Sequence, residues 1–270
     1  MRINKFISET GRCSRREADR LIEAGRVSCN GVRAELGTQV EAGDLVCIDG
    51  EPIGTKPRAV YLALNKPVGI TSTTEAHVEG NIVAFVGHPG RIFPIGRLDK
   101  DSQGLILLTN DGDIVNEILR VENAHEKEYL VRVNRPISDL ALSMLASGVR
   151  IRGVMTRPCR VERIDERSFC MVLTQGLNRQ IRRMCSALGF RVVHLKRVRI
   201  MNIRLGDLAP GAWRELTTAE IEGLHRELAA PPAERPPTTG GRPADARPGR
   251  GRARPPSERS PRPARSSRRG

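Results

Sequence analysis

The first apolar pattern along the chain is a short helical one that begins at Ser14. Ser14 and Glu17 form a predicted capping box, in which both side chains satisfy backbone N–H groups that are free at a helix start. Apolar residues then recur at helical spacing, at Ala18, Leu21 and Ile22. The pattern predicts a helix that buries one face and carries arginines on a neighbouring face.

Short apolar runs between turn residues predict strands in the rest of this segment. Asn30-Gly31 separates residues 27–29 from residues 32–34, which is a strong hairpin signal. Residues 45–48 form another apolar run between two turns. We therefore expect residues 1–55 to form a small separate module, joined to the rest of the chain by a short linker.

Strand-like and helix-like runs alternate from residue 59 to residue 230. Strand patterns cover residues 59–64, 128–133, 161–164, 169–173 and 192–195, and helical patterns cover residues 113–120, 138–146 and 178–188. A mixed order of this kind predicts an α+β domain built on a largely antiparallel sheet.

A charged segment interrupts the apolar pattern at residues 96–105. Arg97 and Asp99 lie between the apolar residues 93–95 and the apolar run 105–108. We expect Asp99 to be partly shielded from water beside a cation, an environment that is costly for a carboxylate. Two interpretations stay open, namely a structural ion pair next to a turn and a catalytic carboxylate that a guanidinium keeps ionised.

The overall charge favours a polyanionic partner. Lysine and arginine exceed aspartate and glutamate by 45 to 31, which gives a formal net charge of +14. Such a balance indicates nucleic acid or an acidic membrane surface as the partner. Because aromatic residues make up only 3% of the chain, extensive stacking of bases along an open groove is not expected. Recognition is expected to rest on phosphate contacts and a pocket.

The cysteines and histidines show no metal-binding pattern. The six cysteines contain no C-x-x-C pair and the five histidines no cluster, so neither a zinc site nor a disulfide framework is expected. Free thiols are typical of a reducing cytosol, and no apolar run approaches the roughly 18 residues that a membrane-spanning helix needs. We expect a soluble, cytoplasmic protein with no membrane partner.

The last segment of the chain, residues 231–270, has a different composition from the rest. It holds ten of the 18 prolines and eleven arginines against three acidic residues, which gives 11 − 3 = +8. With almost no bulky apolar residues, this tail is expected to be disordered. Two roles stay open, a non-specific RNA-binding arm and a solubilising extension with no fixed role.

The charged segment carries a family resemblance. The pattern G-R-L-D-x-x-S-x-G-L at residues 96–105, followed by L-L-T-N-D-G, is very similar to the signature of the RsuA-type pseudouridine synthases, which modify ribosomal RNA. The resemblance implies that Asp99 is the catalytic residue of an isomerase. Pseudouridine formation needs no redox step, group donor or metal, so no cofactor is expected.

The N-terminal module resembles the S4 RNA-binding domain. The likeness rests on I-N-K-F-I-S near the start, then C-S-R-R-E-A-D, I-x-x-G-R-V and N-G. It implies a basic surface for structured RNA, which would otherwise be an ordinary solvated face, formed by Lys5, Arg12, Arg15, Arg16 and Arg20. The fold expected for the whole chain is an S4 domain, an α+β synthase domain at residues 59–230 and a disordered basic tail.

Helical spacing at residues 178–188 places the apolar positions on one face and the arginines on the other. An ordinary solvated basic face is one interpretation of these arginines. The family resemblance implies that the arginine of the Q-I-R element, Arg182, pairs with the catalytic aspartate. Arg179 and Arg183 are then expected to meet RNA phosphates.

Four further residues take roles by residue match to the family. Tyr129, from the K-x-Y element, is expected to contact the target base and to help remove its C5 proton. Arg97 is expected to fill the gap left by the extruded uridine or to hold an adjacent phosphate. RNA contacts are also expected from Lys127 and from Lys66, which belongs to the N-K-P-V-G loop.

The motifs at residues 65–75 and 81–86 are most similar to family members that modify large-subunit ribosomal RNA. They imply a uridine in a stem-loop near the catalytic centre of the ribosome, with a tyrosine tRNA anticodon uridine as a second target. A sister synthase with another ribosomal RNA uridine is the alternative. The partner is structured RNA, and a monomer is expected because the enzyme approaches a large folded molecule.

Two other functions compete with the synthase interpretation. A metal-dependent phosphodiesterase would use paired carboxylates to hold Mg²⁺, drawn from Asp99, Asp101, Asp111 and Asp113. The sequence N-D-G-D at residues 110–113, however, is more typical of a turn and a helix start. A non-catalytic ribosome-binding factor would rely on the S4 module and the tail alone.

Overall fold

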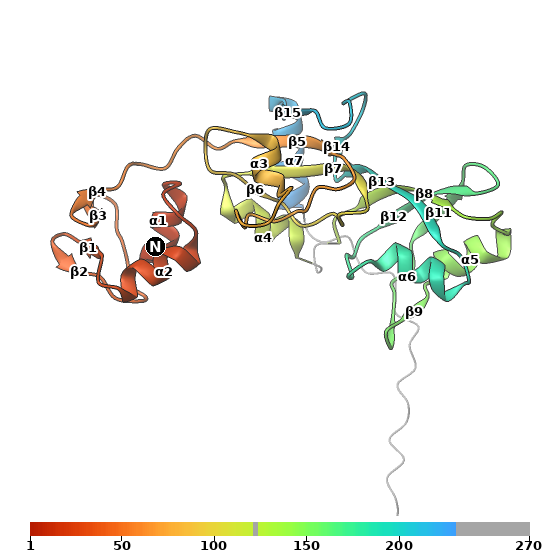
Figure 1. The fold of residues 1–270 in the computed structure, drawn as a ribbon, viewed down its shortest axis with the longest axis horizontal. Coiled ribbons are helices and arrows are strands. Elements are labelled where there is room, and N and C mark those ends of the chain that lie inside the picture. The colour runs from red at the N-terminus through yellow and green to blue at the C-terminus, as the bar shows by residue number, and fades with distance from the viewer. Residues whose placement is uncertain (121–123, 231–270) are drawn as a thin grey trace, which may run out of the picture. The chain divides into compact units, whose positions relative to one another are not determined.

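The computed structural model describes residues 1–120 and 124–230 (Figure 1). The predicted disordered tail, residues 231–270, lies outside the described residues. In the part of the chain that is described, no helix combines the length and the apolar character needed to cross a bilayer.

The N-terminal module consists of two helices and a four-stranded sheet. The helices are α1 (Ile3–Glu9) and α2 (Arg15–Glu23), and the strands, in the order β2-β1-β3-β4, are β1 (Val27–Cys29), β2 (Val32–Arg33), β3 (Val46–Ile48) and β4 (Glu51–Pro52). Both helices bury apolar residues against the sheet, including Ile3, Ile7 and Ile22. The expected hairpin and the helix after Ser14 are present, whereas helix α1 was not anticipated.

Local signals determine where these elements begin and turn. The Ser14 hydroxyl accepts the backbone N–H of Glu17 at 3.2 Å and caps α2. Only half of the predicted capping box forms, because the Glu17 carboxylate pairs with Arg20 at 3.1 Å instead. Asn30 and Gly31 both take positive φ values, 53° and 80°, which is the conformation that a two-residue hairpin turn requires.

A nine-stranded sheet forms the second part of the molecule. Its main path runs in the order β11-β12-β8-β13-β7-β5-β15. The path comprises β5 (Tyr61–Lys66), β7 (Gln103–Thr109), β8 (Lys127–Val133), β11 (Arg160–Arg163), β12 (Ser168–Leu173), β13 (Val192–Ile200) and β15 (Trp213–Glu215). Strand β14 (Ile203–Arg204) pairs with β13, and β6 (Phe93–Pro94) pairs with β7. Only β13 and β7 are parallel, so the prediction of a mixed, largely antiparallel sheet is confirmed.

Helices cover this sheet, and a short hairpin extends from it (Figure 1). The helices are α3 (Ile82–Val86), α4 (Gly112–Leu119), α5 (Asp139–Ser147), α6 (Gln180–Ala187) and α7 (Thr218–Ala229), and the hairpin pairs β9 (Arg150–Ile151) with β10 (Val154–Met155). Residues of α5 and α6 pack with those of β8 and β12 in one core cluster. Residues of α4 and α7 pack with those of β7 in another.

Strand β7 is buried on both faces, which explains its unbroken apolar run. Leu105 and Leu107 face the cluster that contains α4 and α7, whereas Ile106 and Leu108 face the cluster that contains α3. A strand covered on both sides needs apolar residues at every position. The loop that precedes β7, which carries Asp99, is therefore attached to a strand in the interior of the domain.

Candidate active site

A cavity of about 300 Å³ lies beside the loop before β7, at the lower end of the ~300–1,000 Å³ typical of ligand pockets. Three segments that are far apart in the sequence form its wall. They are the loop residues Arg97, Leu98, Asp99 and Ser102, Tyr129 on β8, and the segment from Gln175 to Arg182 that leads into α6.

Buried hydrogen bonds hold Asp99 at the edge of this cavity. Leu98 is only 6% exposed, and the hydroxyl of Ser72 accepts its N–H at 3.2 Å and donates to its carbonyl oxygen at 2.8 Å. The turn closes where the N–H of Ser102 donates to the carbonyl oxygen of Asp99 at 3.0 Å. These bonds fix the backbone on both sides of Asp99, and Asp99 itself lines the cavity.

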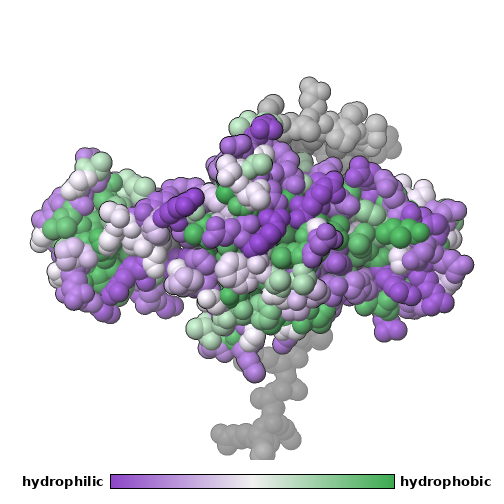
Figure 2. All heavy atoms as spheres, turned by 90° about the horizontal axis from the view of Figure 1, so that it is seen from above, coloured by the Kyte–Doolittle hydropathy of each residue, from purple (hydrophilic) through white to green (hydrophobic). Residues whose placement is uncertain are grey.

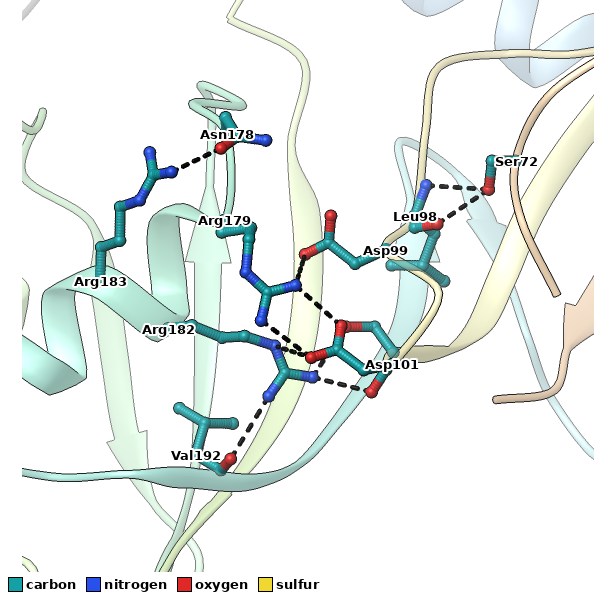
Figure 3. Close-up of polar contacts among 10 residues, drawn as sticks. Ser72, Leu98, Asp99, Asp101, Asn178, Arg179, Arg182, Arg183 and Val192 are labelled. Atoms are coloured by element: carbon teal, nitrogen blue, oxygen red, sulfur yellow. Dashed lines mark hydrogen bonds and ion pairs between the residues drawn. The ribbon is translucent and has the colours of Figure 1, made fainter. Parts of the chain in front are cut away.

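Asp99 itself has few partners. Its carboxylate is 32% exposed and lies 3.5 Å from an Nη atom of Arg179 (Figure 3). Within residues 1–120 and 124–230, no group donates a hydrogen bond to this carboxylate. Asp99 thus combines partial burial, a nearby cation and free lone pairs, which is the arrangement expected of a carboxylate that acts on a substrate.

Asp101, two residues later, is fully engaged. Arg179 donates to both of its carboxylate oxygens, at 3.0 and 2.8 Å, and the Nε atom of Arg182 lies 3.4 Å away. The paired Arg179 guanidinium lowers the pKa of Asp101. Figure 3 shows both arginines reaching from the α6 segment to the loop that carries the two aspartates. Asp101 therefore anchors the arginines, while Asp99 has only the longer ion pair with Arg179.

Arg182 holds the loop in place through hydrogen bonds and does not pair with Asp99. Its guanidinium donates to the carbonyl oxygen of Asp101 at 2.8 Å, to the hydroxyl of Ser102 at 3.0 Å and to the carbonyl oxygen of Val192 at 3.3 Å. Its side chain is only 14% exposed. The predicted Arg182–Asp99 pair is therefore wrong for this structure, in which Arg179 takes that place.

The reason lies in where α6 begins. Arg179 is the residue before the helix and has a left-handed backbone, with φ of 52°. Its side chain therefore does not follow the helical spacing that the sequence suggested. The predicted buried face is confirmed, since Ile181, Met184 and Cys185 are all buried. Arg183 points away from the aspartates and donates to Asn178 at 2.6 Å (Figure 3).

Arg197 is a residue that sequence reasoning missed. It is 3% exposed, and it donates to the carbonyl oxygen of Leu105 at 2.7 Å and to that of Arg97 at 3.5 Å. It thereby joins β13 to both ends of the Asp99 loop. A single arginine in a strand-like run carries no signal of this role.

Gly104 is the second glycine of the G-R-L-D-x-x-S-x-G pattern. Strands β7 and β13 approach each other closely at the parallel pair Gly104–Arg197. A Cβ atom on Gly104 would lie 2.2 Å from the carbonyl oxygen of Arg197, and its φ is +104°. Only glycine satisfies both constraints, so this residue allows the loop to enter the sheet beside Arg197.

Lys66 was predicted to contact RNA, and the structure contradicts this. Its side chain is fully buried, and its ammonium donates to the carbonyl oxygens of Pro67 and Ile70, both at 2.9 Å. Burial lowers the pKa of Lys66 to about 8. The residue holds the 67–70 loop from inside, because an apolar run on β5 carries its side chain into the core.

Tyr129 and Lys127 lie on the same central strand, β8. Tyr129 pairs with Met171 on one side and Arg197 on the other, and its side chain lines the cavity together with Asp99. Lys127 is half-buried and donates to the carbonyl oxygen of His125 at 3.2 Å. Burial lowers its pKa to about 8. The structure thus brings Tyr129 to the site, as the sequence predicted.

Arg97 is exposed at the rim of the site. It lines the cavity and also a neighbouring one of about 490 Å³ that Val68, Gly69 and Lys100 border. Asp99 and Arg179 line both cavities as well. The loop that carries Asp99 therefore separates two hollows, and Arg97 is placed to reach a ligand in either.

In the N-terminal module, Arg12, Arg15, Arg16 and Arg20 are exposed, as predicted. Lys5 is partly committed to an ion pair with Glu9 at 3.4 Å. Figure 2 shows hydrophilic residues spread over the face in view, with the hydrophobic ones divided among several smaller areas. Exposed cations of this kind remain available to a polyanion.

The acidic residues after β7 do not form a metal site with Asp99. Asp111 caps α4 by accepting the N–H of Asp113 at 3.1 Å, and it accepts the hydroxyl of Tyr61 at 2.9 Å. Across the described ranges, no three His, Cys, Asp or Glu side chains come together as metal ligands would. The donor set that the phosphodiesterase alternative requires is therefore not assembled there.

Two family models match the chain. The model described as RNA pseudouridylate synthase matches residues 60–187, and the S4 domain model matches residues 1–53. The first match contains Asp99, Tyr129 and Arg179. The second covers the module with the exposed arginines.

Individual proteins match over most of the chain. The dual-specificity RNA pseudouridine synthase RluF of Salmonella typhi is 53% identical over 249 residues, covering 91% of this chain and 86% of that protein. Ribosomal large subunit pseudouridine synthase B of Bacillus subtilis is 35% identical over 232 residues, covering 83% and 95%. A crystal structure of a pseudouridylate synthase superposes with a TM-score of 0.61 at 32% identity, covering 83% of this chain and 99% of that one.

Proposed function

Because the chain belongs to the RNA pseudouridylate synthase family, whose members are isomerases that act on RNA, we propose that it converts a uridine of large-subunit ribosomal RNA to pseudouridine with Asp99 as the catalytic residue. The reaction breaks the bond between ribose C1′ and uracil N1, turns the base and joins C1′ to C5. The C5 proton leaves and N1 gains one, so the product is an isomer of the substrate.

The observation that carries this proposal is the contrast between two neighbouring carboxylates. Asp101 accepts hydrogen bonds from Arg179 on both oxygens, whereas Asp99 faces the cavity with one ion pair at 3.5 Å. An ionised carboxylate with free lone pairs serves as a nucleophile or as a base. Arg179 supplies a positive charge 3.5 Å from the Asp99 carboxylate.

Tyr129 is the second residue to which we assign a role in the reaction. Its side chain lines the same cavity as Asp99, and its ring offers a flat apolar surface for the uracil, with a hydroxyl for proton transfer at C5. Arg182 acts indirectly, because its hydrogen bonds to Asp101 and Ser102 hold the loop that carries Asp99. In this assignment Arg182 is a positioning residue.

A uridine in a stem-loop must leave the stack to enter the cavity, at a cost of a few kcal/mol that is lowest for unpaired bases. Arg97, exposed at the rim, stabilises the extruded state by filling the gap or by holding a phosphate. Residues 1–55 supply the wider contact to structured RNA through Arg12, Arg15, Arg16 and Arg20, and residues 59–230 perform the chemistry.

The choice of RNA follows from the relatives. The similarity to RluF, described as dual-specificity, and to a ribosomal large subunit synthase supports a large-subunit ribosomal RNA target and a second RNA target, for which we propose a tRNA anticodon uridine. We further propose that the protein acts as a monomer in the cytoplasm. Light scattering of the purified chain measures the oligomeric state directly.

The experiment that tests the proposed function is tritium release from RNA labelled at uridine C5. The wild-type protein is expected to release tritium from large-subunit ribosomal RNA, and Asp99→Asn is expected to release none above background. Absence of release by the wild type from ribosomal RNA and tRNA alike contradicts the assignment. Mapping of pseudouridine in total RNA from a strain that lacks the gene then identifies the target uridine.

A further inference from the structure

Gln175 is a buried polar residue with an unused hydrogen-bonding group in the wall of the cavity. Gln175 is only 9% exposed, and it lines the cavity together with Asp99 and Tyr129. Its amide nitrogen is buried and has no hydrogen-bond partner among the described residues. Buried amides are nearly always paired, because an unpaired one loses its bonds to water.

A second glutamine in the same segment shows that the fold can satisfy such a group. Gln180 is 4% exposed, and its side-chain oxygen accepts the N–H of Leu177 at 3.0 Å, while its nitrogen lies 3.7 Å from the sulfur of Met184. Gln180 thus stabilises the start of α6. Gln175, five positions earlier, makes no comparable bond through its amide nitrogen.

Charge makes a phosphate an unsuitable partner for Gln175. Arg97, exposed on the cavity wall, already offers a charged donor for an anion. A neutral primary amide offers one donor and one acceptor side by side in a plane. The edge of uracil that carries N3–H between two carbonyl groups presents the complementary pair.

We propose that Gln175 binds the imide edge of the target uracil, with its oxygen accepting N3–H and its nitrogen donating to the C4 carbonyl oxygen. The proposal rests on the proposed function, because it names the group that recognises the base in that reaction. Gln175 is then a specificity-determining residue that holds the uracil beside Asp99 and Tyr129. The amide nitrogen of Gln175 has almost no accessible surface in the free protein, so this contact requires the side chain to turn its amide toward the cavity.

The test replaces the glutamine and alters the base in turn. Gln175→Met keeps the length of the side chain and removes the donor and the acceptor. We expect kcat/KM for a uridine-containing stem-loop to fall roughly 10- to 100-fold, the range associated with a bidentate contact to a base. The melting temperature of this variant is expected to stay unchanged or to rise, because no bond within the protein is lost.

Modified substrates separate base recognition from a general defect. The wild type is expected to act poorly on 3-methyluridine, which lacks N3–H, and on 4-thiouridine, which has a weaker acceptor at C4. In Gln175→Met both penalties, measured relative to uridine, are expected to shrink toward 1. Asn81→Ala is the control, since it removes a satisfied, buried amide that lines neither cavity and should lower the melting temperature while leaving the two penalties intact.

Two results overturn the proposal. One is wild-type kcat/KM for uridine in Gln175→Met, and the other is a penalty for 3-methyluridine and 4-thiouridine that is equal in variant and wild type. If Gln175→Met does not fold, equal turnover of all three bases by the wild type decides against the proposal. Failure of the proposed function is a different outcome, because the wild type then makes no pseudouridine at all.

Discussion

The arginines of the N-terminal module and those beside the cavity look alike in sequence and serve opposite purposes. Arg12, Arg15 and Arg16 are exposed and form no ion pair within the described part of the chain. Arg182 and Arg197 are instead largely buried, and each donates hydrogen bonds to backbone carbonyl oxygens. Exposed charges interact weakly with one another through water and salt. They are therefore available for RNA, while the enclosed ones hold the loop that carries Asp99.

This comparison indicates that basic residues in an RNA enzyme form two classes with different consequences. Replacing a member of the exposed class should weaken RNA binding and leave the fold intact. Replacing a member of the enclosed class should change stability and turnover. Substitutions can separate the two classes and can test Asp99, the acidic residue whose loop the enclosed arginines hold.

The largest effect is expected at Asp99. Asp99→Asn keeps the shape and removes the charge, and we expect kcat to fall by about 10³-fold or more, as for other residues that react with substrate. Asp101→Asn should retain measurable turnover, because Asp101 only anchors Arg179 and Arg182. Tritium release under single-turnover conditions compares the two. Equal losses would show that both carboxylates act on the substrate and that the distinction between them is wrong.

Lys66 provides a test through pH. The folded protein lowers the pKa of Lys66 from 10.5 to about 8, so the unfolded chain binds more protons between these values and stability rises with pH. The free energy of unfolding of the wild type minus that of Lys66→Met should therefore increase by up to about 3 kcal/mol between pH 8 and 10.5. Denaturant unfolding at several pH values measures this difference.

If this difference in unfolding free energy does not change between pH 8 and 10.5, the Lys66 ammonium is solvated and Lys66 belongs to the exposed class. RNA affinity at neutral pH offers an independent check on the same residue. Because the side chain is fully buried, Lys66→Met should leave the salt dependence of RNA binding unchanged.

Arg182 tests the cost of losing an enclosed guanidinium. Arg182→Gln removes hydrogen bonds to Asp101, Ser102 and Val192, and we expect a loss of about 2–3 kcal/mol in the free energy of unfolding. Arg16→Gln, at an exposed position of α2, should change it by no more than about 0.5 kcal/mol. Thermal and urea unfolding of the two variants supply the comparison, and equal losses would remove the distinction between the classes.

The smallest effect is expected from the exposed arginines of the N-terminal module. Arg15→Ala combined with Arg16→Ala should leave stability unchanged and lower the slope of log affinity against log salt by about 0.7–0.9 for each lost phosphate contact. Titration of a labelled stem-loop at several salt concentrations measures the slope. An unchanged slope would mean that this surface does not bind RNA phosphates.

Local signals predicted much of the fold. Ser14 caps α2, Asn30-Gly31 turns the first hairpin, and the apolar run at residues 105–108 is a strand buried on both faces. In each case the residues that matter are close neighbours in the chain. Helix α1 escaped prediction because its ends carry no side-chain cap, so its formation depends on packing against α2.

The candidate site was predicted only in part. Asp99 and Tyr129 meet at one cavity, as the motifs implied. The partner of Asp99 was misassigned, because the choice between Arg179 and Arg182 depends on the left-handed backbone of a single residue at the start of α6. The burial of Lys66 was also missed, since a lysine after an apolar strand is equally compatible with an exposed loop.

The sequence by itself determined the family, the order of an S4 module and a synthase domain, and the segment that carries Asp99. These properties are encoded in residues that are adjacent along the chain. Only the tertiary structure decided which arginine faces Asp99, that Arg197 and Lys66 act from inside, and that Gln175 is left with an unpaired amide. Each of these depends on contacts across the sheet and its loops, where burial and close approach decide which polar groups find partners.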